Sequence, residues 1–351
     1  MKSDFIKNFL KTAQPIVNRI PLMNQRSYQT TFFTLKPLPS DVIYDEIEDF
    51  SYKAEWVIPP DEDPEKVIFY THGGGYGMGD LVSSRALIAP IAKKTGIRVF
   101  SFEYRLAPEH PFPAAFDDAK KAYEYVLGQG YSPGNIIAFG ESAGGGLAVS
   151  NILRLIAEGK EAPQCLVTIS PWSDLTATGQ TYFLNEDKDP LLRGKYLKRL
   201  ADSYVGDDSP LNPYISPAFA SYDDRFPPTL IQAGSDEVLL DDSKLLYNAM
   251  KDGGVDVDLF ADADGLLGLA DCHLGAGGDQ VGQLQSLVQH HVGRVDMLDQ
   301  TDLKGLLGVD GAAGEHQLHG GGHAYDALKA LGAAETGSDA QPNLRHAEGC
   351  L

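Results

Sequence analysis

The stretch AFGESAGGGLAVS, residues 138–150, decides the fold. It reads as the end of an apolar strand, a sharp turn at GESAG and then an apolar helix, which is the context that a G-x-S-x-G nucleophile elbow requires. Gly140 and Gly144 leave room for the chain to pass close to itself, and such a turn exposes the hydroxyl of Ser142. The helix that starts behind the turn places the positive end of its dipole near the negative charge that develops in the reaction, and so stabilises that charge. Ser142 is therefore predicted to be a catalytic nucleophile.

Other strands of the same kind surround the elbow. Short β-branched or aromatic runs alternate with helical patterns and end in polar or glycine-rich turns: KVIFYTH (66–72), IRVFSFEY (97–104), CLVTISPW (165–172) and TLIQAGS (229–235). This alternation predicts an α/β fold with a mostly parallel central sheet flanked by helices. Chemistry in such sheets is found at the carboxyl ends of the strands.

The first of these strands leads into HGGG, residues 72–75. Acyl transfer through a serine needs preorganised N–H donors for the oxyanion, and glycines without Cβ atoms can turn their amides toward it. Gly73, Gly74 and Gly75, together with Ala143 after the nucleophile, are the predicted oxyanion hole. His72 precedes the serine, the wrong chain order for the base of this triad, so we interpret it as an anchor of the loop.

Composition narrows the class of protein. The 351 residues are 43% hydrophobic, enough for one large core, and the net charge of −20 disfavours nucleic acid and anionic membrane surfaces as partners. Three distant cysteines form neither a disulfide framework nor a metal-type spacing. No apolar run approaches the ~18 residues of a membrane span, and the first 20 residues lack a signal-peptide pattern, so we expect a cytoplasmic protein.

Several further motifs stand in a fixed order along the chain. HGGGY (72–76), YRLAPEHPFPAAFDDA (104–119), GESAGGGLA (140–148), SPWSDL (170–175), DPLL (189–192) and PPTLIQAGSDEVLLDDS (227–243) resemble the bacterial hormone-sensitive-lipase family of α/β-hydrolase carboxylesterases. The likeness runs from about residue 40 to about residue 260. It implies hydrolysis of small carboxylic esters with short or medium acyl chains and no metal or organic cofactor. The oligomeric state stays open, with a homodimer as one option.

The resemblance also implies a domain organisation. Residues 1–45 are expected to form N-terminal cap helices, and residues 46–260 the α/β-hydrolase core. A second part of the helical cap is expected as an insertion at about 176–215, after SPWSDL. Residues 261–351 form an atypical tail.

The triad acid is carried over from the family pattern of an acidic residue followed at the second and fourth positions by leucine and aspartate. Glu237, Leu239 and Asp241 match it, and Asp236 is the second candidate. Physically, a carboxylate just beyond the strand 229–234 can accept a hydrogen bond from the imidazole. Asp241 and Asp242 are expected to cap the following helix. Buried scaffolding is expected of four other polar residues: Arg105, Glu109, His110 and Asp174.

The base is where the sequence departs from the family. The resemblance implies a histidine in a turn of the form G-M-x-H about 30 residues beyond the acid, but aligning Gly265 with the start of that turn puts Gly268 at the histidine position. His273, five residues further on, is the nearest candidate base. Because nucleophile and base must lie within ~2.6–3.2 Å, we expect this chain to have weak esterase activity or none.

The tail, residues 261–351, differs in character from the rest of the chain. It holds 17 of the 37 glycines and seven of the nine histidines, and Tyr325 is its only aromatic residue. Three interpretations stay open, in this order: the end of the gene translated in a displaced frame, a divergent extension, or a metal-binding tract at His316, His319 and His323.

The motifs together predict a hydrolytic mechanism. Ser142 attacks an ester carbonyl, a histidine takes the serine proton and returns it to the leaving alcohol, and water repeats the cycle on the acyl-enzyme. Two alternatives remain. One is a non-catalytic or crippled relative in which the elbow survives without the base, and the other is an amidase, because amidases and esterases share the triad.

Overall fold

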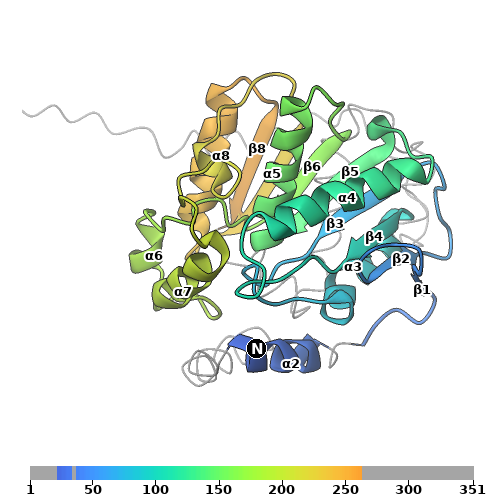
Figure 1. The fold of residues 1–351 in the computed structure, drawn as a ribbon, viewed down its shortest axis with the longest axis horizontal. Coiled ribbons are helices and arrows are strands. Elements are labelled where there is room, and N and C mark those ends of the chain that lie inside the picture. Colours follow the sequence, from blue (N-terminus) through green and yellow to red (C-terminus); the bar gives the residue numbers. More distant parts are fainter. Residues whose placement is uncertain (1–21, 34–36, 263–351) are drawn as a thin grey trace, which may run out of the picture. The chain divides into compact units, whose positions relative to one another are not determined.

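A computed structural model describes residues 22–33 and 37–262, in which an eight-stranded sheet is the central element (Figure 1). The strands lie side by side in the order β1-β2-β4-β3-β5-β6-β7-β8. Their bounds in chain order are β1 (Ile43–Glu46), β2 (Ala54–Ile58), β3 (Val67–Thr71), β4 (Arg98–Phe102), β5 (Ile136–Glu141), β6 (Cys165–Ile169), β7 (Thr229–Gly234) and β8 (Val257–Asp262).

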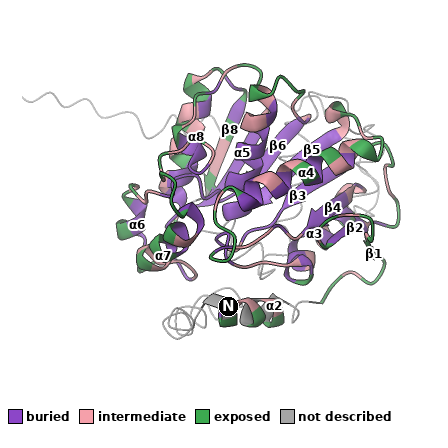
Figure 2. Ribbon diagram, in the orientation of Figure 1, coloured by how far each residue is buried: buried purple, intermediate pink, exposed green. Residues whose placement is uncertain are grey.

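The sheet is mostly parallel, as predicted. β4, β3, β5, β6, β7 and β8 pair in parallel, whereas β2 runs antiparallel to both β1 and β4. Every residue of β3, β5, β6 and β7 is buried. In Figure 2 the labelled strands β3, β5 and β6 have the colour of buried residues. Parallel strands that are covered on both faces have no polar side, which explains their unbroken apolar runs.

Helices cover the sheet. In Figure 1, α4 (Ala114–Gly128), α5 (Ala143–Ala157) and α8 (Leu240–Asp252) lie in front of the strands, and α4 packs against α5. α3 (Leu81–Thr95) contacts β2 and β4, and α2 (Leu22–Phe33) contacts α3. α3 begins after Asp80, whose carboxylate accepts the Ser83 N–H at 2.7 Å, and ends at Gly96 in the left-handed conformation. Two short 3-10 turns are η1 (Pro133–Asn135) and η2 (Pro217–Phe219).

The chain between β6 and β7 carries two further helices, α6 (Thr181–Leu184) and α7 (Gly194–Val205). The inward face of α7 is buried and includes Leu200 and Tyr204. The Tyr204 ring stacks on Tyr76, in the loop after β3, with ring centroids 3.6 Å apart and an interplanar angle of 4°. α7 is therefore packed against the glycine-rich loop by aromatic contact.

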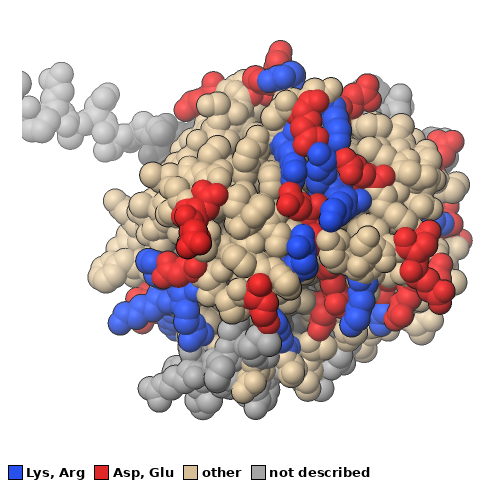
Figure 3. All heavy atoms as spheres, viewed as in Figure 1, with Lys and Arg blue, Asp and Glu red and all other residues tan. Residues whose placement is uncertain are grey.

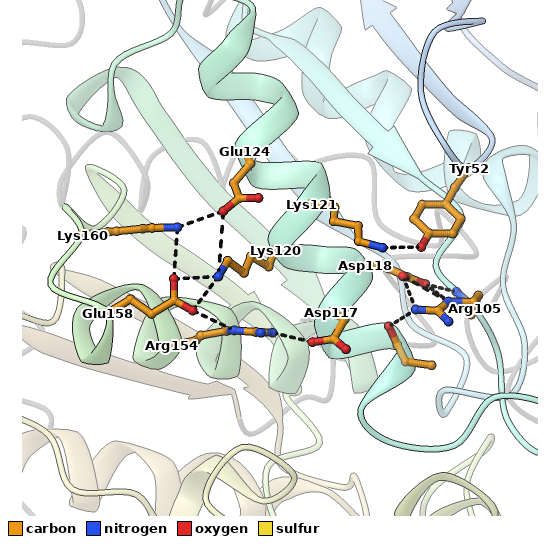
Figure 4. A network of polar contacts seen from close by, with 11 residues as sticks. Tyr52, Arg105, Asp117, Asp118, Lys120, Lys121, Glu124, Arg154, Glu158 and Lys160 are labelled. Carbon is orange, nitrogen blue, oxygen red and sulfur yellow. Dashed lines mark hydrogen bonds and ion pairs between the residues drawn. The ribbon is translucent and has the colours of Figure 1, made fainter.

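Charges of both signs are interspersed on the surface seen in Figure 3. One network joins α4 and the end of α5 (Figure 4), where Glu158 accepts from Lys120 Nζ at 2.6 Å, Lys160 Nζ at 3.0 Å and Arg154 Nε at 3.2 Å. Lys120 makes the largest contribution to lowering the pKa of Glu158, to about 2. Among the described residues, no helix has both the length and the apolar character needed to cross a membrane.

The Glu158 network predicts a specific acid sensitivity. A glutamate whose pKa is lowered by folding stabilises the folded state above its unfolded value, ~4.3, and that contribution is lost as the pH falls toward about 2. Thermal unfolding of wild type should therefore lose stability more steeply across this window than Glu158→Gln. Glu161→Gln, which removes an exposed charge outside the network, controls for net charge. Parallel curves for wild type and Glu158→Gln would contradict the expectation.

Candidate active site

Ser142 occupies the tight turn between β5 and α5. Its φ is 55° and its ψ is −125°, a left-handed conformation that is costly for a residue with a Cβ atom. The turn is held by backbone hydrogen bonds: the Ser142 N–H donates to Ile169 O at 2.9 Å, and Ser142 O accepts from Trp172 N at 2.8 Å. The strain and the bracing by the end of β6 are what the predicted nucleophile elbow requires.

The two glycines of the elbow are required by close backbone approach. A Cβ atom at Gly140 would lie 2.5 Å from Gly144 O, and one at Gly144 would lie 2.0 Å from Thr71 O. The Thr71 hydroxyl also donates to Gly144 O at 2.7 Å. Because Thr71 ends β3, the elbow is locked against the start of the HGGG loop.

The HGGG loop needs its three glycines because of close contacts and positive φ angles. A Cβ atom at Gly73 would lie 2.0 Å from Glu141 Oε2, and Gly74 has a φ of 108°. Gly75 has a φ of 62°, and its Cβ atom would lie 2.5 Å from a methyl carbon of Leu200 on α7. Bare backbone at these positions lets the loop pass between the elbow and α7.

His72 is buried behind this loop. Its ring stacks on Tyr104 with centroids 4.0 Å apart, and its Nδ1 lies 2.8 Å from Gly73 O. The Tyr104 hydroxyl donates to His72 O at 2.7 Å. Burial lowers the pKa of His72, so the neutral imidazole is favoured. These contacts fit the loop-anchor interpretation of this histidine.

Glu237 lies in the turn after β7 and is buried, whereas Asp236 beside it is exposed. The Glu237 Oε2 atom accepts the Gly234 N–H at 3.2 Å and the hydroxyl of Ser170. Ser170 directly follows Ile169, whose carbonyl accepts the Ser142 N–H. The ends of β5, β6 and β7 therefore connect Ser142 to Glu237 through two hydrogen bonds and one peptide link. Sequence reasoning missed Ser170, whose signals are a hydroxyl at the end of a strand and its place at the start of SPWSDL.

The predicted helix-capping role of Asp241 and Asp242 is wrong. The residue that precedes α8 is Leu239, so Asp241 and Asp242 lie inside its first turn, and the Asp241 N–H is accepted by the Thr181 hydroxyl at 3.1 Å. Asp242 is buried and accepts the N–H groups of Ser173 and Asp174 at 3.1 and 2.8 Å. Burial holds the pKa of the Asp242 carboxyl well above its usual range. The buried SPWSDL loop needs acceptors for its backbone donors, and this demand outweighs the local capping preference.

Of the four predicted scaffold residues, Asp174 has the expected buried role, and Arg105 has it only in part, because its side chain is not buried. Asp174 is buried and accepts the N–H groups of Thr176 and Thr178 at 2.8 and 3.1 Å. Arg105 is half-buried, and its guanidinium forms an ion pair with the buried carboxylate of Asp118 at 2.7 Å. Both contacts fix loops next to the site.

For the other two, Glu109 and His110, burial was predicted wrongly, because both are exposed. Glu109 accepts two hydrogen bonds, at 2.8 and 2.7 Å, from Arg26 on α2. Arg26 Nε also donates to Gly77 O at 2.8 Å, so this arginine ties α2 to the loop that follows HGGG. Sequence spacing cannot reveal a pair that is 83 residues apart.

Gly268 and His273 lie outside the described residues, as do the tail histidines His316, His319 and His323. Within residues 22–33 and 37–262, no group of three or more His, Cys, Asp or Glu side chains is arranged to hold a metal ion. The described part of the site thus contains a strained serine, a glycine loop and a buried carboxylate.

These features define a serine hydrolase, and comparison with known proteins agrees. A family model described as the α/β hydrolase fold matches residues 68–265. The chain is 31% identical to a crystal structure of an esterase from the bacterial hormone-sensitive lipase family, with a TM-score of 0.77, covering 83% of this chain and 98% of that one. The chain belongs to the hormone-sensitive-lipase family of α/β-hydrolase carboxylesterases, which confirms the resemblance inferred from its motifs.

Two relatives indicate the same class of enzyme. An acetyl-hydrolase of Streptomyces hygroscopicus is 40% identical over 204 residues, which cover 58% of this chain and 68% of the relative. An esterase of Acinetobacter venetianus is 41% identical over 180 residues, which cover 51% of this chain and 59% of the relative. As a member of this family, the chain is a hydrolase of carboxylic esters.

Proposed function

We propose that the protein hydrolyses esters through a triad of Ser142, Glu237 and a histidine. The observation that carries this proposal is the left-handed Ser142 turn, connected through the end of β6 to the buried Glu237. A carboxylate in that position can hold the tautomer of an imidazole and stabilise the imidazolium that forms. The exposure of Asp236 supports Glu237 as the acid.

In the proposed mechanism, Ser142 Oγ attacks the ester carbonyl and forms a tetrahedral oxyanion. The amides of Gly73, Gly74 and Ala143, with Gly75 completing the loop, donate to that oxyanion. The base takes the serine proton and returns it to the leaving alcohol, and water then hydrolyses the acyl-enzyme. His273 is the nearest candidate base in the chain, but it stands five residues beyond the expected position, so turnover should be weak or absent.

The proposed substrates are small esters with short to medium acyl chains. The similarity to a protein named acetyl-hydrolase favours the short end of this range. We also propose that residues 1–45 and 176–215 form the cap over the site. The stacking of Tyr204 on Tyr76 and the hydrogen bonds of Arg26 support this, because they join α7 and α2 to the loop around the glycines. A cytoplasmic location and a homodimer stay predictions.

Labelling and turnover together test the function. A fluorophosphonate probe should label the protein, and a short p-nitrophenyl ester should be hydrolysed faster than the matching p-nitroanilide. Labelling without turnover of either substrate would favour the crippled relative, and a preference for the anilide would favour an amidase. The two alternatives therefore give different results from the proposed esterase.

The assignment of the acid predicts a ranking of variants. Glu237→Gln should lower kcat far more than Asp236→Asn, because a neutral amide neither stabilises an imidazolium nor enforces its tautomer. Each substitution removes one charge with little change in shape, so the two variants control for each other. The kinetics are measured with the short p-nitrophenyl ester. The reverse ranking would move the acid to Asp236.

A further inference from the structure

Three polar side chains on the segment 181–189 reach the turn that carries Glu237. The Thr181 hydroxyl donates to Val238 O at 2.8 Å. The Asn185 amide donates to Ser235 O at 3.0 Å and to Glu237 O at 2.9 Å, and Asp189 Oδ2 accepts the Val238 N–H at 2.8 Å. The backbone on both sides of Glu237 is thus bonded to one segment of the chain between β6 and β7.

The spacing of these side chains explains how one segment supplies all of them. Thr181, Asn185 and Asp189 stand four residues apart, so a helical backbone places them on one face. The backbone has this form, because Asn185 N donates to Thr181 O at 3.0 Å and Asp189 N donates to Asn185 O at 2.9 Å. The sequence TYFLNEDKD therefore contains a row of three hydrogen-bonding groups aimed at the acid turn.

All three side chains are buried, with exposed fractions of 7% for Thr181, 4% for Asn185 and 2% for Asp189. Removing a buried partner leaves the backbone groups that it served without their hydrogen bonds, which is the costly case. Asp189 Oδ1 also accepts the N–H groups of Leu191 and Leu192 at 2.7 and 2.9 Å, just before α7. One carboxylate therefore joins the acid turn to the approach to α7.

We propose that Thr181, Asn185 and Asp189 are positioning residues that hold the Glu237 turn in its catalytic place, so that the acid is aligned only while segment 181–189 is docked on it. The inference rests on the proposed role of Glu237. The side chain of Glu237 is held from Ser170 and Gly234, and its backbone is held from this row. Both sets of contacts are needed because a misplacement of about 1 Å at a catalytic group can cost about 10²-fold in rate.

Asn185→Ala tests the inference with two readouts. Amide hydrogen exchange of residues 234–239 should become about tenfold faster, because two bonds to that turn are lost. With a short p-nitrophenyl ester, kcat should fall about 10- to 100-fold while KM stays within about twofold. Asn135→Ala is the control, because Asn135 lies in η1 before β5, at the opposite end of that strand from Ser142 and outside the proposed cap, so neither readout should change.

A second pair of variants, both at Thr181, separates the effect of the hydroxyl group from the effect of side-chain packing. Thr181→Val keeps the shape and loses the hydrogen bonds, so it should show the same two effects, whereas Thr181→Ser keeps the hydroxyl and should retain most of kcat. If both variants lost kcat equally, the row would be packing alone and the inference would be wrong.

The outcomes separate this inference from the proposed function. Unchanged exchange of residues 234–239 in Asn185→Ala overturns the positioning role, whatever the turnover. Faster exchange with an unchanged kcat overturns it as well, provided that Glu237→Gln lowers kcat in the same assay. If Glu237→Gln has no effect on kcat, the proposed acid is wrong. The inference then fails for that reason, whatever Asn185→Ala shows. Faster exchange with a lowered kcat supports the inference.

Discussion

Ser142→Ala is expected to abolish fluorophosphonate labelling and to lower ester hydrolysis from the weak level expected of this chain to the background of the assay. Ser142 alone supplies the attacking oxygen in the proposed mechanism, and no neighbouring hydroxyl has its position in the elbow. The fold should survive, because the backbone bonds of Ser142 to Ile169 and Trp172 do not involve the hydroxyl. Alanine also keeps the Cβ atom, so the conformational cost of the left-handed turn is similar in both proteins.

Ser150→Ala is the control for this experiment. Ser150 lies on the same helix, is buried and donates its hydroxyl to Gly146 O at 2.9 Å, so the substitution tests the loss of a serine hydroxyl from α5 without touching the elbow. Labelling and kcat/KM of Ser150→Ala should stay near wild type. If Ser142→Ala kept more than about a tenth of the activity, another nucleophile would have to be sought.

The elbow and the sheet could be predicted because their signals are local. The pattern of strand, GESAG and helix specifies a turn within a few residues, and Gly140 and Gly144 are needed by contacts that the turn itself creates. The parallel strands can be recognised in the sequence as apolar runs, because both of their faces are buried. The reversed direction of β2 has no such signal, since its pairing partners are set by the topology of the whole sheet.

The polar residues that support the site were harder to assign, because their partners are distant in sequence. Asp242 bonds to Ser173, 69 residues away, and a local preference for helix capping gave the wrong partner. Thr181 and Asn185 belong to no motif, and Asp189 begins DPLL, a motif to which no role was assigned. Only the structure shows that these side chains face the acid turn. The buried environment, which decides between such roles, depends on the fold and not on neighbours in the chain.

The reasons for the glycines of the HGGG loop could be predicted only in part. The predicted reason for its glycines was the oxyanion, and the structure adds steric reasons that a sequence cannot supply. Glu141 fills the space beside Gly73, and Leu200 of α7 fills the space beside Gly75. A substitution at Gly75 would therefore disturb the packing of α7 as well as any donor role, so loss of activity there is a poor test of the oxyanion hole.

The second large effect is a gain of activity when a histidine is placed at position 268. β8 runs parallel to β7, so its carboxyl end is at the same edge of the sheet as Glu237, and the family turn G-M-x-H follows that strand. Leu266→Met with Gly268→His restores this turn. A general base in place typically contributes about 10²–10⁴-fold, so kcat/KM for a short p-nitrophenyl ester should rise by that order.

Gly268→Ala, which removes the glycine without adding an imidazole, should give no such rise and serves as the control. His273→Ala in the unaltered chain should change little, because an imidazole five residues beyond the expected position has to return through the LADC sequence to reach within ~2.6–3.2 Å of Ser142 Oγ. If the tail is the end of the gene translated in a displaced frame, replacing the residues after the turn by those of a relative should raise kcat/KM further. Full activity in the unaltered chain, abolished by His273→Ala, would instead make His273 the base and the tail a working part of the enzyme.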